Sequence, residues 1–248
     1  MKDFKFLENK LLCFLDKYLK QSGASGFSIG VSGGLDSAIV ATLCSKVAKT
    51  HALLMPTNNS NNLNLEDGLI LCEKLDLEYE VINIEPIVQS FISVLDVTDK
   101  LRKANIIARV RMILLYDNSA KLGTLVAGTS NKSERLLGYG TIYGDTACAL
   151  NPIGDIYKSD LFLFAKYLEI DENIINKAPS ADLWEGQKDE DEIGFAYSSV
   201  DAVLKEFEKN DQRENLYAIF NKNLVDSVLD RVEKNSFKLN PVPIANIS

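Results

Sequence analysis

The chain has 248 residues, of which 46% are hydrophobic and 25% are charged, a balance typical of folded globular proteins rather than disordered or fibrous ones. A chain of this length can bury one substantial core, so we expect a single domain over residues 1–248. The formal net charge of −8 argues against nucleic-acid and acidic-membrane partners, because an acidic surface repels polyanions.

Strands that alternate with helices are predicted over the first half of the chain. Apolar stripes with a period near 3.6 residues indicate helices, and short apolar segments between turn residues indicate strands. The helices are expected at 4–19, 38–48, 65–75, from Pro86 onward and at 98–118. The strands are expected at 27–31, 51–55, 79–84 and 125–127. This alternation implies right-handed crossovers and an α/β fold, a doubly wound parallel sheet with helices on both faces.

The pattern is looser beyond Gly138. Extra helices are expected toward the C-terminal end, at 158–168, 197–208 and 225–233. A polar run, 180–192, lies among them, and its acidic part, 189–192, is either a solvated loop or an active-site lid.

The cysteines and the N-terminus indicate the compartment. The four cysteines form no C-x-x-C pair, so neither a zinc site nor a disulfide framework is predicted. The N-terminus has no signal-peptide pattern, and no apolar run approaches the roughly 20 residues that span a bilayer. We therefore expect a cytoplasmic protein without a membrane segment.

A positive region extends from residue 100 to residue 135, where eight Lys or Arg stand against two acidic residues. On an acidic protein such a region suits a small phosphate-bearing ligand. The alternative is an exposed helix face with scattered charge and no ligand.

Residues 32–37, Ser-Gly-Gly-Leu-Asp-Ser, form what we name the phosphate loop, between the first predicted strand and the following helix. Gly33 and Gly34 let the backbone approach a phosphate, Ser32 and Ser37 add hydroxyl donors, and the helix N-terminus offers unpaired N–H groups. We expect this loop to hold pyrophosphate. An ordinary glycine turn is the alternative.

Asp36 in the phosphate loop would be repelled by phosphate unless a metal ion lay between them. Mg²⁺ favours carboxylates together with phosphate oxygens, so we expect that ion. No Lys follows the glycines, so the loop is not a Walker A sequence, and simple γ-phosphate cleavage is not predicted. The only histidine, His51, opens a predicted strand, which argues against a Ser-His-Asp or Cys-His mechanism.

The phosphate loop resembles the signature of the ATP pyrophosphatases, whose fold is Rossmann-like and of the adenine nucleotide α-hydrolase type. Within that class, two segments resemble the NAD synthetase family. Residues 105–112 are similar to its N-x-x-A-R-x-R-M helix, and residues 128–134 are similar to its G-T-(D/S)-x-x-x-E loop. Later segments also follow the family pattern, so the resemblance covers almost the whole chain.

The resemblance implies a ligase that forms a C–N bond in the last step of NAD biosynthesis. ATP adenylates the carboxylate of nicotinic acid adenine dinucleotide (deamido-NAD), pyrophosphate leaves, and ammonia displaces AMP. It also implies Mg²⁺, ATP as co-substrate, and a homodimer with the dinucleotide site at the subunit interface. Since 248 residues leave no room for an additional glutaminase domain, free ammonia is the expected nitrogen donor.

The resemblance also implies roles for individual residues. Those expected to contact ATP are Ser32, Gly33, Gly34, Asp36, Ser37, Arg109, Thr129, Lys158 and Ser180. Asp36 and Glu134 are expected to share Mg²⁺. The residues expected to bind the dinucleotide are Tyr139, Asp145 and Lys238. The expected catalytic residues are Asp36, Lys158 and Asp145, with Lys158 offsetting charge on the leaving pyrophosphate and Asp145 receiving ammonium.

Structural roles are the alternative for several of these residues. Arg109 and Arg111 are also consistent with a solvated helix face, Glu134 with a helix N-terminal charge, and Asp145 with a turn after Gly144.

Two rival functions fit the phosphate loop. A tRNA-modifying enzyme of the same class would favour a broad basic surface, which the acidic balance opposes. A non-catalytic nucleotide-binding module would not require Glu134 together with Lys158. The chain also departs from the family at Ala149, where many members have a second aspartate, and at Phe237, where His is frequent.

Overall fold

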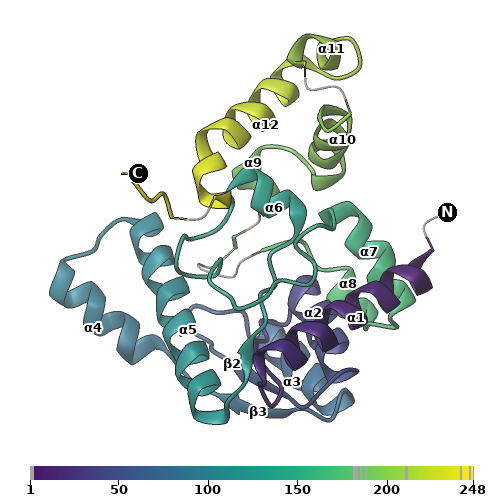
Figure 1. The fold of residues 1–248 in the computed structure, drawn as a ribbon. Helices are drawn as coiled ribbons and strands as arrows, with labels where there is room; N and C mark the ends of the chain where they lie inside the picture. Colours follow the sequence, from purple (N-terminus) through teal and green to yellow (C-terminus); the bar gives the residue numbers. More distant parts are fainter. Residues whose placement is uncertain are drawn as a thin grey trace.

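The computed structural model describes residues 3–180, 184, 186–187, 189–209, 212–240, 242–245 and 247. The described residues include a four-stranded parallel sheet in the order β3-β2-β1-β4. Figure 1 shows β2 and β3 in its lower part, with helices around them. The strands are β1 (Phe27–Gly30), β2 (Thr50–Leu54), β3 (Glu78–Val81) and β4 (Leu125–Val126). The chain winds from β1 to β2 and β3, then returns to place β4 on the other side of β1. The predicted doubly wound sheet is therefore confirmed.

Helices cover both faces of the sheet. Side chains alternate along β2, so Ala52 and Leu54 enter one apolar core and Leu53 enters another. The larger core packs against α1 (Phe4–Ser22), α2 (Leu35–Ser45), α3 (Asn62–Lys74), α7 (Lys158–Tyr167) and α8 (Glu172–Ile175). The smaller core lies under α4 (Glu85–Leu95) and α5 (Lys100–Leu122).

Local sequence explains several of these helix boundaries. Asp3, Asn61 and Asp99 each accept a hydrogen bond from a backbone N–H in the first turn of α1, α3 and α5. Gly23 and Gly123 end α1 and α5 in the left-handed conformation. Because Asn61 is the cap, α3 begins at Asn62, three residues before the start predicted at residue 65.

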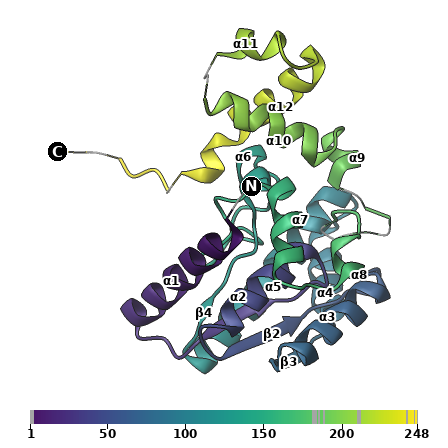
Figure 2. The same cartoon turned by 90° about the vertical axis from the view of Figure 1, so that its right-hand side faces the viewer.

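A group of C-terminal helices stands apart from the sheet (Figure 2). It consists of α10 (Tyr197–Phe207), α11 (Arg213–Tyr217), α12 (Lys222–Asn235) and the 3-10 helix η1 (Ser236–Leu239). Their apolar side chains form a third core together with Leu137, the last residue of α6 (Lys132–Leu137). The extra C-terminal helices are as predicted. Their core includes Leu137 of α6, the helix that also carries the predicted site residue Glu134.

Several short helices are not predicted from the sequence, namely α6, α8, α9 (Asp189–Ile193) and α11. The acidic run is therefore helical, and Asp189 at its start is only 4% exposed. For Asp189, the interpretation as part of a solvated loop is wrong, because the side chain turns into the protein.

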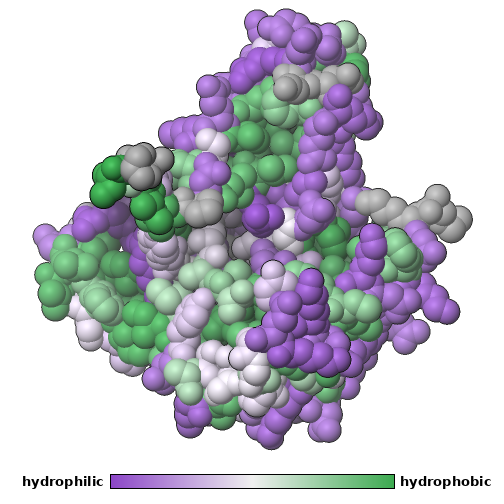
Figure 3. Space-filling model, viewed as in Figure 1, coloured by the Kyte–Doolittle hydropathy of each residue, from purple (hydrophilic) through white to green (hydrophobic). Residues whose placement is uncertain are grey.

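The surface of the described residues includes an apolar region on α4. The outer side of α4 carries exposed apolar side chains, including Phe91, Val94 and Leu95 (Figure 3). Within the ranges given above, no helix is both long and apolar enough to cross a membrane.

Candidate active site

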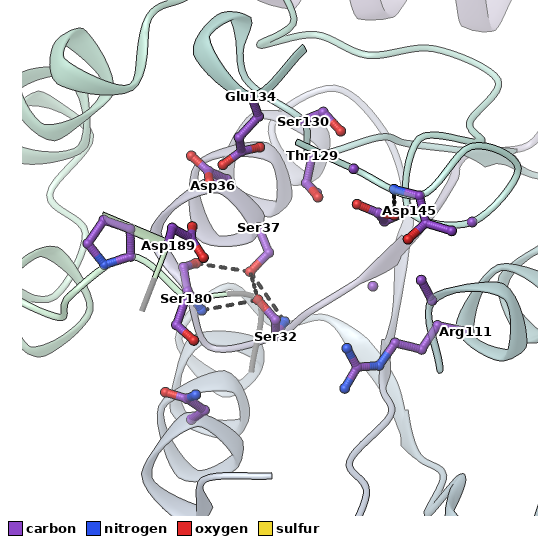
Figure 4. Close-up of a pocket in the computed structure, with 18 of the residues that line it drawn as sticks. Ser32, Asp36, Ser37, Arg111, Thr129, Ser130, Glu134, Asp145, Ser180 and Asp189 are labelled. Carbon is purple, nitrogen blue, oxygen red and sulfur yellow. Dashed lines mark hydrogen bonds between the residues drawn. The ribbon is translucent and has the colours of Figure 1, made fainter. Parts of the chain in front are cut away.

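A cavity of about 490 Å³ opens at the carboxyl edge of the sheet. Its walls come from the segments that follow β1, β2 and β4, together with α5 and the turn after α6. Figure 4 shows the side chains of Ser32, Asp36, Thr129, Glu134 and Asp189 gathered around one space. The position agrees with the general rule that ligands of doubly wound sheets bind beyond the carboxyl ends of the strands.

The phosphate loop turns sharply between β1 and α2. Gly33 has a φ of 74°, and a Cβ atom there would lie 1.9 Å from the carbonyl oxygen of Asn64, so only glycine fits. The hydroxyls of Ser32 and Ser37 lie 3.2 Å apart, and Ser37 Oγ donates to the carbonyl oxygen of Gly34 at 3.0 Å. Gly34 caps α2 without a side-chain hydrogen bond, so the first turn can present its N–H groups to an anion.

A buried lysine joins two carboxylates beside the phosphate loop. Lys158 Nζ lies 2.5 Å from Asp36 Oδ2 and 3.6 Å from Glu134 Oε1. The side chain of Lys158 is 5% exposed, and those of Asp36 and Glu134 are 16% and 15% exposed. The three residues come from α7, α2 and α6, so the fold assembles this cluster from distant segments.

Burial shifts the acid–base equilibria of this cluster. Burial, followed by the charge of Asp36, raises the pKa of Glu134 to about 8. Burial acts to lower the pKa of Lys158, but the two carboxylates outweigh it and raise that pKa, so the ammonium stays charged. Burial also raises the pKa of Asp189 to about 6, against the charge of Lys158, which lowers it. One ammonium therefore faces the carboxyl groups of Asp36, Glu134 and Asp189, and burial opposes the ionisation of Glu134 and Asp189.

Asp36 and Glu134 fit the requirements of a Mg²⁺ ion. The Oδ1 atom of Asp36 is buried without a hydrogen-bond partner, a costly state that a bound cation would relieve. In the part of the chain that the structure describes, no three or more His, Cys, Asp or Glu side chains are grouped to hold a metal. Two carboxylates suit an ion that completes its coordination with phosphate oxygens and water.

The predicted substrate residues lie on another wall of the same cavity. Asp145 Oδ1 accepts a hydrogen bond from the Thr141 N–H at 2.7 Å. The surrounding protein desolvates this carboxyl and raises the pKa of Asp145, although its side chain keeps contact with solvent. Lys238 Nζ donates to two carbonyl oxygens of the turn after α6, at 2.7 and 2.9 Å. The Tyr139 hydroxyl donates to Asp189 Oδ1 at 3.2 Å.

Most of the predicted site residues line the cavity. They are Ser32, Gly34, Asp36, Ser37, Thr129, Glu134, Tyr139, Asp145, Lys158, Ser180 and Lys238. Gly33, the second residue of the phosphate loop, is not among the lining residues. Arg109 also lies outside the lining, and its Nη2 donates to the carbonyl oxygen of Ile142 at 3.2 Å. Arg111 lines the cavity instead, because residues two apart on a helix point about 200° from each other.

The family model for NAD synthase matches residues 7–242. The chain therefore belongs to the NAD synthase family. The NH(3)-dependent NAD(+) synthetase of Campylobacter jejuni is 50% identical over 238 residues, which are 95% of this chain and 96% of that relative. The solved structure of NMN synthetase from Francisella tularensis is similar with a TM-score of 0.91 and 34% identity, covering 100% of both chains. The NH3-dependent NAD synthetase from C. jejuni, in complex with the nitrate ion, has a TM-score of 0.86 and 44% identity, covering 99% of this chain and 100% of that one.

This NAD synthase family site also contains lining residues that are not among the predicted site residues, among them Arg111, Lys177 and Asp189. Lys177 Nζ lies 3.2 Å from the carbonyl oxygen of Gly33 and 2.5 Å from Asp67 Oδ2, so it ties the phosphate loop to α3. The available signal is the family resemblance. Arg111 lies in the segment 105–112, and Lys177 and Asp189 lie in the later segments 177–183 and 189–197, which also follow the family pattern. Nothing in those segments shows which side chain turns toward the cavity.

Proposed function

We propose that this chain uses ATP to join ammonia to the nicotinate carboxylate of deamido-NAD, which yields NAD, AMP and pyrophosphate. The observation that carries the proposal is Lys158, buried between Asp36 and Glu134 beside the phosphate loop. A carboxylate is a poor electrophile until one of its oxygens belongs to a leaving group, so this chemistry requires groups that neutralise phosphate charge. Membership of the NAD synthase family and the name of the C. jejuni relative support the assignment.

In the first step, a carboxylate oxygen attacks the α-phosphorus of ATP, and the bond to the pyrophosphate oxygen breaks. The N–H groups of the phosphate loop and the hydroxyls of Ser32 and Ser37 hold the departing pyrophosphate. The ammonium of Lys158 offsets the negative charge that grows on it. The further ATP contacts that we propose from the family resemblance are Gly33, Gly34, Arg109, Thr129 and Ser180.

Asp36 and Glu134 are the residues that we propose as Mg²⁺ ligands. The buried Oδ1 atom of Asp36 and the raised pKa of Glu134 support this assignment, because both indicate carboxyl groups short of positive charge. When bound, Mg²⁺ supplies positive charge to the phosphate oxygens. Without the ion, the ammonium of Lys158 would have to offset the two carboxylates as well as the charge on the leaving pyrophosphate.

In the second step, ammonia attacks the carbonyl carbon of the adenylate, AMP leaves, and one proton is released for each amide formed. We place the dinucleotide against Tyr139 and Lys238, and we assign Asp145 as the carboxylate that receives ammonium. The hydrogen bond from the Thr141 N–H keeps one Asp145 oxygen fixed. A fixed carboxylate attracts a small cation by its charge and by a charge-assisted hydrogen bond.

The test is an assay with ATP, MgCl₂ and deamido-NAD, supplied in parallel with ammonium or with glutamine. We expect one NAD and one pyrophosphate for each ATP consumed with ammonium, and no NAD above background with glutamine. Nicotinic acid mononucleotide serves as a second acceptor, because one structural relative is an NMN synthetase. We expect a higher kcat/KM with the dinucleotide, since the relatives at 50% identity are NAD synthetases.

The rival functions give different outcomes in the same assay. A tRNA-modifying enzyme would form neither amide and would adenylate tRNA. A nucleotide-binding module would bind ATP without releasing pyrophosphate. Either result would reject the proposal.

We further propose that the protein acts as a homodimer in the cytoplasm, without a nucleic-acid or membrane partner. Exposed apolar side chains at Phe91, Val94 and Leu95 on α4, and at Leu101 on α5, support an interface between copies of the chain (Figure 3). Sedimentation velocity at micromolar concentration should give twice the chain mass of 27.5 kDa. A species of single chain mass would contradict the dimer.

A further inference from the structure

We propose that Asp201 is a positioning residue that holds Lys158 and Glu134 in place, an inference that rests on the proposed function. Asp201 lies on α10, in the group of C-terminal helices, and is only 1% exposed. It is not among the residues that line the cavity, and its carboxylate is hydrogen-bonded to Ser133 and Ser159. Its carboxylate nevertheless connects α6 and α7, the helices that carry Glu134 and Lys158.

Each oxygen of the Asp201 carboxylate accepts a hydrogen bond from a residue of one of these helices. Oδ1 accepts from the Ser133 hydroxyl at 2.5 Å, and Oδ2 accepts from the Ser159 N–H at 2.8 Å. Ser133 Oγ in turn accepts from the Lys158 N–H at 2.9 Å. Ser133 precedes Glu134 on α6, whereas Lys158 and Ser159 begin α7. We name these three hydrogen bonds the Asp201 relay.

The direction of each bond in the Asp201 relay is fixed by chemistry. A backbone N–H can only donate, so Ser133 Oγ must accept from Lys158 and turn its single proton toward Asp201. For the same reason Asp201 must accept from Ser159, and it therefore accepts at both oxygens. A carboxylate meets this demand, whereas an amide offers one acceptor and one donor. The relay thus requires an acid at this position and not merely a polar side chain.

The Asp201 relay also supplies the cap that α7 lacks. Tyr157, the N-cap residue, makes no side-chain hydrogen bond to the first turn, so the leading N–H groups of α7 rely on Ser133 and Asp201. A carboxylate is also favoured there by the helix dipole. Because Lys158 is the first residue of α7, movement of this helix start moves the ammonium. A displacement of about 1 Å at a catalytic group can cost on the order of 100-fold in rate.

Kinetics of Asp201→Asn test the consequence of the relay. We expect kcat for NAD formation to fall about 10- to 100-fold, as for other supporting partners of site residues. The KM for ATP should change much less, because Lys158 acts on charge that develops as pyrophosphate leaves. Ser133→Ala should lower kcat similarly, and the double variant should lose little more than either single one.

The matched control is Val203→Ala, on the same helix. Val203 is fully buried in the third core, so its truncation destabilises the C-terminal helices without touching the relay. Its kcat per folded molecule should equal that of the wild type. If Val203→Ala lowers kcat as much as Asp201→Asn at the same loss of stability, Asp201 is merely structural and the inference is overturned.

Amide hydrogen exchange gives a readout that needs no turnover. Asp201→Asn should speed exchange at Lys158 and Ser159 about tenfold relative to Phe164 in the same helix, the equivalent of one lost hydrogen bond. Unchanged exchange together with unchanged kcat would overturn the inference. If the wild-type chain forms no NAD, the proposed function fails, and exchange alone then decides whether the relay exists.

Discussion

Glu134 should make the metal-free protein less stable as the pH rises, and Glu134→Gln should remove this loss. Burial and the charge of Asp36 raise the pKa of Glu134 from 4.5 to about 8. The unfolded chain releases this proton near pH 4.5, whereas the folded protein keeps it until about pH 8. Between these values the folded protein binds more protons, so its stability falls as the pH rises and levels off above the window.

The expected loss is about 3 kcal/mol between pH 5 and pH 8. One proton contributes about 1.4 kcal/mol per pH unit, and incomplete titration at both ends of the window reduces the sum. The side chain of Glu134 is 15% exposed, so solvent screens its charge only slightly. Glutamine has nearly the same shape and no charge. The stability of Glu134→Gln relative to the wild type should therefore rise by this amount over the same range.

Urea unfolding in EDTA at each pH unit from 5 to 8 measures this difference. Glu66→Gln, at an exposed position on α3, is the control and should change the unfolding free energy by less than about 0.5 kcal/mol throughout. In the assay with Mg²⁺, Glu134→Gln should lose about 100-fold or more in activity, because a proposed metal ligand is gone. A difference between wild type and Glu134→Gln that stays constant from pH 5 to pH 8 would refute the reasoning.

Three further predictions concern the phosphate loop and Asp145. Asp36→Ala should abolish pyrophosphate release, and unchanged turnover would remove Asp36 from the mechanism. Gly33→Ala should unfold the loop and abolish ATP binding by calorimetry, because the new Cβ would meet the Asn64 carbonyl oxygen. Gly23→Ala is the control. Gly23 has a similar positive φ, but no atom lies within 4 Å of the Cβ position, so the variant should lose only about 1–2 kcal/mol of stability in thermal unfolding and keep full activity. Asp145→Asn should raise the KM for ammonium about tenfold or more and leave the KM for ATP nearly unchanged; equal changes in both would argue against its role.

The phosphate loop could be predicted because its parts are contiguous in the sequence. A short apolar strand, two glycines and an apolar helix follow one another, and their geometry depends on neighbouring residues alone. The same holds for the alternation of strands and helices that implies a doubly wound sheet. Caps such as Asp3 and Asp99 are also local, and they place α1 and α5 within a few residues of the expected bounds.

The short helices could not be predicted in this way. A helix of four to six residues is unstable by itself and forms only where tertiary contacts and caps support it. For α6, that support is the capping box between Asn131 and Glu134. For α9, the Asp189 side chain is buried and accepts a hydrogen bond from the Tyr139 hydroxyl, a contact between residues 50 positions apart. A run of four acidic residues gives no sign of this.

The sequence by itself therefore determined the fold class, the phosphate loop and the residue types that the chemistry requires, since all of these are written in short contiguous patterns. Only the tertiary structure decided which side chains meet. Packing rotates α5 so that Arg111 lines the cavity while Arg109 does not. It also brings Asp201 to Ser133 and Ser159, 68 and 42 residues away. Such contacts depend on how distant elements share one core, and no local periodicity records that arrangement.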